Sequence, residues 1–90
     1  MSGGHFNYDQ HRLRDIADSI DTIIENNSIE DNWGYCTNYS ELTLSRLAVI
    51  SKMLRTCYDL VHEVDWMLSG DTGEDTFNRE YERIQDGQAP

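Results

Sequence analysis

The sequence is poor in chain breakers and has no long apolar run. It contains six glycines and a single proline, which is the last of its 90 residues. With hydrophobic residues at 38% of the composition, this pattern indicates a folded chain rather than a disordered one. No apolar run approaches the roughly 20 residues needed to cross a bilayer, and the first ten residues lack the basic and apolar segments of a signal peptide. We therefore expect a single domain, residues 1–90, that does not enter a membrane.

Cysteine and histidine are also scarce. The two cysteines, Cys36 and Cys57, are too few for the disulfide framework of a small secreted protein. They do not combine with His5, His11 or His62 at the spacings of a zinc site. We expect free thiols in a reducing cytoplasm, and neither a metal nor a cofactor.

Positive charge is the third scarce feature. The chain has seventeen acidic residues and only seven basic ones, which gives a net charge of −10 and an isoelectric point near 4.4. Such a field repels nucleic acid and anionic membranes, and it attracts basic surfaces. We therefore expect no direct binding of DNA or RNA. The expected partner is a protein with a basic surface.

The hydrophobic pattern predicts an all-α fold with three helices. The first helix is expected at about residues 8–27, with Asn7 or Asp9 as its cap. The third is expected at about 74–85, followed by a frayed end. Their apolar residues recur at spacings of three and four. These residues are Leu13, Ile16, Ile20 and Ile23 in the first helix, and Phe77, Tyr81 and Ile84 in the third.

The central helix is expected at about residues 41–69, between Ser40 as its N-cap and Gly70 just past its end. Two adjoining apolar stripes run along it, which predicts contacts with more than one neighbour. The first stripe is Leu47, Ile50, Leu54, Cys57, Val61, Val64 and Leu68, and the second is Met53, Leu60 and Met67.

The central helix is too long for a compact molecule of this size. At 1.5 Å per residue it should measure ~43 Å, whereas a compact globule of 90 residues is only ~31 Å across. Either the molecule is elongated or the far end of the helix packs on a second copy. We favour a homodimer.

Two segments outside the helices also carry expectations. Residues 28–39 include Trp33 and Tyr35, and we expect an ordered aromatic loop whose rings lie over the end of the core. The segment SGDTGED, residues 69–75, lacks both the alternating ligands of a calcium loop and the lysine of a phosphate loop. It fits a corner between helices, with Asp71 or Thr72 as the cap of the third helix.

Trp66 lies away from the first apolar stripe and has two interpretations. Residues 5–8 or the third helix fold back and cover it, or it is an exposed anchor for a partner, rimmed by Asp59, Glu63 and Asp65. Asp59, His62 and Glu63 share one turn, but no nucleophile accompanies them, so we expect no catalytic residue and no enzyme. The candidate partner-binding residues are Asp59, Glu63, Asp65, Trp66, Asp71, Glu74 and Asp75.

Three segments, SGGHFNYDQHRLRDIADSID, NYSELT and VDWMLSGDTGEDTF, resemble a family of small, acidic, uncharacterised proteins of bacteriophages and prophages. The resemblance carries no catalytic or binding residue. It implies an accessory protein made in a bacterial cytoplasm, where such proteins commonly block a host component, including CRISPR effectors and nucleotide-signalling defences.

Three functions remain open on these grounds. The first is a non-catalytic inhibitor whose acidic surface occupies a groove built for phosphates in a host protein. The second is an oligomeric sponge that sequesters a small signalling nucleotide between subunits, for which the seven bases would have to cluster. The third is a structural or regulatory phage protein.

Overall fold

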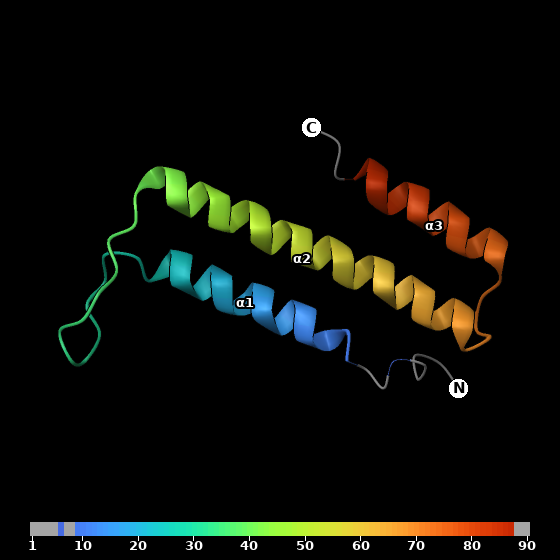
Figure 1. Cartoon of the computed structure of the whole chain (residues 1–90), viewed down its shortest axis with the longest axis horizontal. Coiled ribbons are helices and arrows are strands. Elements are labelled where there is room, and N and C mark those ends of the chain that lie inside the picture. Colours follow the sequence, from blue (N-terminus) through green and yellow to red (C-terminus); the bar gives the residue numbers. More distant parts are fainter. Residues whose placement is uncertain (1–5, 7–8, 88–90) are drawn as a thin grey trace.

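The fold is a single layer of three helices in a computed structural model, which describes Phe6 and residues 9–87. The helices are α1 (His11–Glu25), α2 (Glu41–Leu68) and α3 (Glu74–Asp86). Figure 1 shows α2 between the other two, and each neighbour runs antiparallel to it. No strand occurs among the described residues. The prediction of three helices with a long central one is confirmed.

The ends of α2 also follow the prediction. The side chain of Ser40 accepts a hydrogen bond from the backbone N–H of Thr43 at 3.3 Å, which satisfies one of the free amides of the first turn. At the other end Gly70 has φ 84°, the left-handed conformation that a residue without Cβ adopts at no steric cost.

The predicted caps of the other two helices are wrong where the structure describes them. Gly73 precedes α3 and has no side chain to cap it. Asp71 and Thr72 instead direct their backbone N–H groups to the carbonyl of Trp66, so they close the end of α2. Gln10, not Asp9, precedes α1 and makes no capping bond. Asn7, the other predicted cap, and the predicted first residue of that helix lie outside the described residues.

The molecule is long and thin. Its principal extents are 52 × 30 × 11 Å and its radius of gyration is 16.9 Å, against ~12 Å for a compact chain of this length. The helix α2 contacts α1 along one side and α3 along the other, whereas α1 and α3 do not touch. Contacts with two neighbours were predicted for α2, and the elongated shape is one of the two alternatives that its length left open.

The contact between α1 and α2 is unexpectedly polar. Ser51 Oγ donates to Asp21 Oδ1 at 2.6 Å, and the Arg55 guanidinium donates to both Asp18 and Asp21. The only apolar side chain of α1 that is fully buried is Ala17. On the side of α2 that contacts α1, polar and aromatic residues follow one another at spacings of four and three. We call these residues the polar ladder. The polar ladder consists of Ser51, Arg55, Tyr58, His62 and Asp65.

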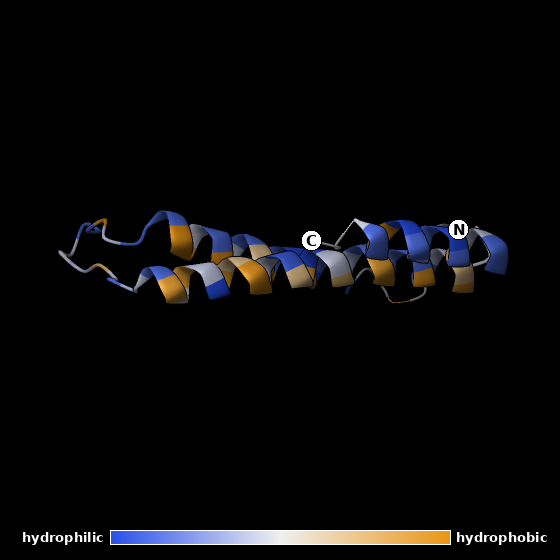
Figure 2. Ribbon diagram, turned by 90° about the horizontal axis from the view of Figure 1, so that it is seen from above, coloured by the Kyte–Doolittle hydropathy of each residue, from blue (hydrophilic) through white to orange (hydrophobic). Residues whose placement is uncertain are grey.

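The first apolar stripe of α2 consequently does not point at α1. Because a helix turns 100° per residue, a stripe centred on Ile50 and Cys57 lies about a quarter turn from Ser51 and Tyr58. It faces one broad side of the layer, where Ile50 is 46% and Leu68 is 50% exposed. Figure 2 shows the layer edge-on, and in this view the hydrophobic segments of the helices lie mainly toward their lower side.

The aromatic loop does not cover a core, so that expectation is wrong. Trp33 is 91% exposed and Tyr35 is 66% exposed. The loop is nonetheless tied together, because the Asp31 carboxylate accepts the backbone N–H groups of both residues, and Ser28 bonds Thr37. Figure 1 shows that this closed loop projects past the ends of α1 and α2, where no helix lies beneath the rings.

Candidate interaction surfaces

Two of the predicted partner-binding residues lie inside the molecule. Asp65 is fully buried and its carboxylate accepts hydrogen bonds from Gln10 Nε2 at 3.0 Å and from Ser69 Oγ at 3.4 Å. Glu63 is 8% exposed and lies close enough to Glu80 and Arg83 of α3 to interact with their charges. Burial, and then the charge of nearby Glu80, raise the pKa of the Glu63 carboxyl above its usual value. Asp65 thus links the start of α1 to α2, Glu63 is buried, and neither forms an exposed rim around Trp66.

Trp66 belongs to a column of rings on α2. Its ring centroid is 4.3 Å from that of His62, which lies 5.7 Å from Tyr58 in a stacked arrangement. The guanidinium carbon of Arg14 lies over the Tyr58 ring, 5.3 Å from the ring centroid. Trp66 is thus half-buried along its own helix. Of the segment predicted to cover it, only Phe6 is among the described residues.

The other predicted residues are exposed acids at one end of the molecule. Asp71, Glu74 and Asp75 lie where α2 passes into α3, and we call these three residues the acidic corner. Glu74 and Asp75 occupy the first turn of α3, where the helix dipole favours negative charge. Asp59, the fourth exposed residue, lies farther back on α2. None of these four carboxylates forms an ion pair within the described part of the chain.

The positive charges are dispersed rather than gathered. Arg55 binds Asp18 and Asp21, and Arg79 and Arg83 both lie beside Glu80. Arg12 lies 3.7 Å from Asp9, and Arg14 lies over Tyr58. Five of the seven bases therefore already have an acidic or aromatic neighbour, and they are spread over all three helices.

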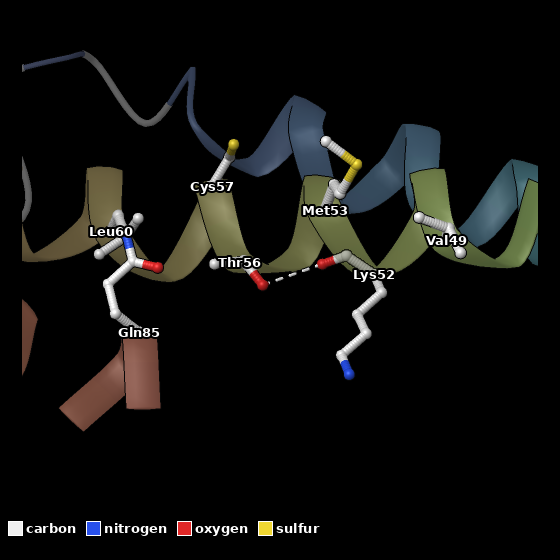
Figure 3. Close-up of a pocket in the computed structure, with 7 residues that line it drawn as sticks. All are labelled: Val49, Lys52, Met53, Thr56, Cys57, Leu60 and Gln85. Carbon is white, nitrogen blue, oxygen red and sulfur yellow. Dashed lines mark hydrogen bonds between the residues drawn. The ribbon is translucent and has the colours of Figure 1, made fainter. Parts of the chain in front are cut away.

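An apolar groove opens beside the middle of α2. Because α3 ends at Asp86, the side of α2 that α3 would cover is open there. The groove has a volume of about 490 Å³ and Figure 3 shows the side chains that line it. They are Val49, Lys52, Met53, Thr56, Cys57, Leu60 and Gln85.

A metal site and a catalytic cluster are two further arrangements to consider among the described residues. Within residues 9–87, no group of three or more His, Cys, Asp or Glu is arranged to hold a metal. His62 lies between the rings of Tyr58 and Trp66, while Glu63 faces α3, so the cluster Asp59–His62–Glu63 does not face a common cleft. Both cysteines are free thiols.

Reasoning from the sequence missed the polar ladder and the groove. The ladder did leave a signal, since its five members are spaced four, three, four and three residues apart, the same pattern as the apolar stripe. The groove left no signal in the sequence, because it depends on the point along α2 at which α3 ends.

None of the described helices combines the length and apolar character needed to span a membrane. No protein-family model, no curated protein and no solved structure matches this chain.

Proposed function

We propose that this protein is a non-catalytic binding protein that docks its acidic corner on a basic surface of another protein. The observation that carries the proposal is the contrast between the two kinds of charge. The carboxylates of Asp71, Glu74 and Asp75 are exposed and form no ion pair with any other described residue, whereas most of the bases already have an acidic or aromatic neighbour. A partner surface rich in Arg or Lys would be complementary in charge to this corner.

The resemblance to phage proteins supports a bacterial host protein as the partner and the host cytoplasm as the place. A groove that binds nucleic acid presents Arg and Lys side chains to phosphates, and a row of carboxylates can occupy the same positions. Binding there would block the groove. Inhibition of a host defence protein, of the anti-CRISPR or a related kind, is the form of this function that we favour.

The distribution of the bases favours docking over the sequestering of a signalling nucleotide. A phosphate site needs several cationic or N–H donors that converge on one point. In this chain Arg55 reaches toward α1, whereas Arg79 and Arg83 surround Glu80 on α3. Within one subunit the bases therefore do not converge on a phosphate site, and a pocket between subunits would have to bring these separated bases together.

The test is capture of a partner from a bacterial lysate with charge-reversed variants. The corner variant replaces Asp71, Glu74 and Asp75 with lysine. The control variant replaces three exposed acids that lie outside the corner, Asp15, Glu25 and Glu30, with lysine. Each replacement adds two units of charge, so both variants carry −4 instead of −10.

A protein captured by the wild type at low salt should be retained by the control and lost from the corner variant. Capture should also weaken as salt rises, because exposed charges are screened over ~10 Å at 0.1 M salt. The captured protein should lose its ability to bind nucleic acid when the wild type is added. Equal loss from both variants would show that net charge alone attracts the protein, and it would contradict a site at the corner.

A further inference from the structure

The single layer has almost no interior of its own. Ala17 and Ile84 are the only buried apolar side chains among the described residues. Stable domains are built from at least two packed layers, because a helix with an apolar stripe must bury that stripe against another element. Here the molecule measures only 11 Å in its thinnest direction, which is the thickness of one layer of helices. The described chain therefore has no second layer against which the apolar stripes could be buried.

The apolar side chains that would form a core gather instead on one broad side of the layer. On α1, Ile16 and Ile23 are 50% and 43% exposed, and on α2, Ile50 and Leu68 are about half exposed. Both sets lie about a quarter turn from the contact between the helices. We call this surface the apolar face. It consists of Ile16, Ile20, Ile23, Ile50, Leu54, Cys57, Val61 and Leu68.

The exposed area is large enough for an interface. The accessible surface is 6566 Å², whereas a compact monomer of 10.5 kDa is expected to expose about 5,400 Å². The difference is about 1,100 Å², of which the projecting loop accounts for a part. A standard interface buries about 800 Å² on each partner. The chain as a whole therefore exposes an excess comparable to one side of a stable dimer interface, and the half-exposed Ile16, Ile23, Ile50 and Leu68 of the apolar face contribute to it.

Charge decides what kind of partner fits. None of the eight residues of the apolar face is charged, although the chain has 24 charged residues in all. The ion pairs of Arg55 and the exposed Asp59 lie on other sides of the layer, to judge from their helical positions. A basic partner would be drawn to those acids and not to this face. A second copy, by contrast, can approach through the face without bringing its ten excess negative charges into contact.

We propose that the apolar face is the interface of a two-fold symmetric homodimer, in which two layers pack face to face and form one shared core. A two-fold axis pairs the same patch on both subunits, so a uniformly apolar surface is complementary to itself. Obligate homodimer interfaces resemble a domain core cut in half, which describes this face. The acidic corners of both subunits remain accessible in the dimer.

The experiment is sedimentation equilibrium of the full chain with two matched variants. Ile50→Glu places a carboxylate on the apolar face, where Ile50 is 46% exposed in the single chain. Ala48→Glu adds the same charge at an exposed position of the same helix that points away from the face. The wild type and Ala48→Glu should have twice the 10.5 kDa mass of one chain. Ile50→Glu should dissociate at least ~tenfold more readily, because the dimer would bury an unpaired charge.

A second measurement applies if Ile50→Glu fails to fold, which far-UV circular dichroism would reveal. The Cys57 thiol is exposed in one chain and lies on the apolar face, whereas Cys36 lies in the loop. In the wild type, the rate of thiol modification at Cys57 should fall as protein concentration rises, while the rate at Cys36 stays constant. A single-chain mass at all concentrations, with a Cys57 rate that does not change, would overturn the proposal. So would equal dissociation of the two glutamate variants.

Discussion

Gln10 Nε2 donates a hydrogen bond to Asp65 Oδ2 at 3.0 Å across 55 residues of the chain. Both residues are buried, and the bond joins the start of α1 to the last turn of α2. Together with the pairing of Asp18 and Arg55 farther along, it fixes how far the two helices are shifted along each other. The register of this helix pair thus rests on specific polar contacts, which tolerate misalignment less well than apolar packing does.

Replacing Asp65 with alanine should therefore destabilise the fold. The amide of Gln10 would remain away from water without this acceptor, and we expect the free energy of unfolding to fall by about 2 to 3 kcal/mol. Urea unfolding at one fixed protein concentration measures the change. The control is Asp59→Ala on the exposed side of the same helix, which should change stability by less than about 0.5 kcal/mol. Equal effects of the two replacements would contradict the structural role of Asp65.

The contact between Ser51 and Asp21 predicts a pH dependence. The Ser51 hydroxyl, and after it the Arg55 guanidinium, hold the pKa of the Asp21 carboxyl below its usual value. A carboxyl with a lowered folded pKa stabilises the fold above its unfolded pKa, and this contribution is lost as pH falls below about 4. Ser51→Ala should raise the Asp21 pKa and move acid unfolding to a higher pH.

The Asp21 titration can be followed directly by NMR, and acid unfolding by circular dichroism. Thr56→Ala is the matched control, since the Thr56 hydroxyl donates to the Lys52 carbonyl within the same helix. It should leave both the Asp21 pKa and the pH of unfolding unchanged. A shift in both variants alike would show that loss of any hydroxyl from α2 has this effect.

Glu63 gives the opposite pH dependence. Its folded pKa is raised, chiefly by burial, so ionisation of this group lowers stability as pH rises above about 4. Glu63→Gln should be more stable than the wild type at neutral pH, and the two should converge in acid, where both side chains are uncharged. Chemical unfolding at several pH values checks this. A variant that is less stable at neutral pH would show that attraction between Glu63 and Arg83 outweighs the cost of burial.

The sequence was sufficient to predict the helices and the ends of α2, because these depend on local signals. Ser40 and Gly70 act within one turn of their own helix, and the spacing of apolar residues needs no knowledge of the neighbours. The sequence was not sufficient to predict what each side of α2 would contact. An apolar stripe must be covered, but hydropathy does not say whether the same chain or a second copy covers it.

The candidate site could be predicted only in part for the same reason. Asp65 and Asp71 are the same residue type six positions apart, yet one is fully buried against Gln10 and the other is exposed at the corner. The difference arises from the docking of α1, a contact between residues far apart in the sequence. The exposed Trp33 is a similar case, since its position depends on how far the loop extends beyond the helices.

The two glycines at the corner should respond differently to substitution. Gly70 has φ 84°, and a Cβ there would meet no atom within 4 Å, so the cost of Gly70→Ala is the left-handed backbone alone. We expect a loss of about 1 kcal/mol in unfolding free energy. Gly73 has φ −100° and precedes α3, so Gly73→Ser should supply a capping hydroxyl and gain a few tenths of a kcal/mol. Thermal unfolding of both variants measures this, and a loss in both would contradict the assignment of the cap.

The two proposed surfaces can be separated once a partner is known. Ile50→Glu leaves the acidic corner intact, so in solution it should bind the partner with an affinity within about twofold of the wild type. On a surface densely coated with partner, the wild-type dimer binds through two corners and should be held at least ~tenfold more tightly than this variant. The corner variant, with lysine at Asp71, Glu74 and Asp75, should bind the partner neither in solution nor on the coated surface. Biosensor measurements at high and low partner density test this, and loss of solution binding by Ile50→Glu would mean that the partner contacts the apolar face.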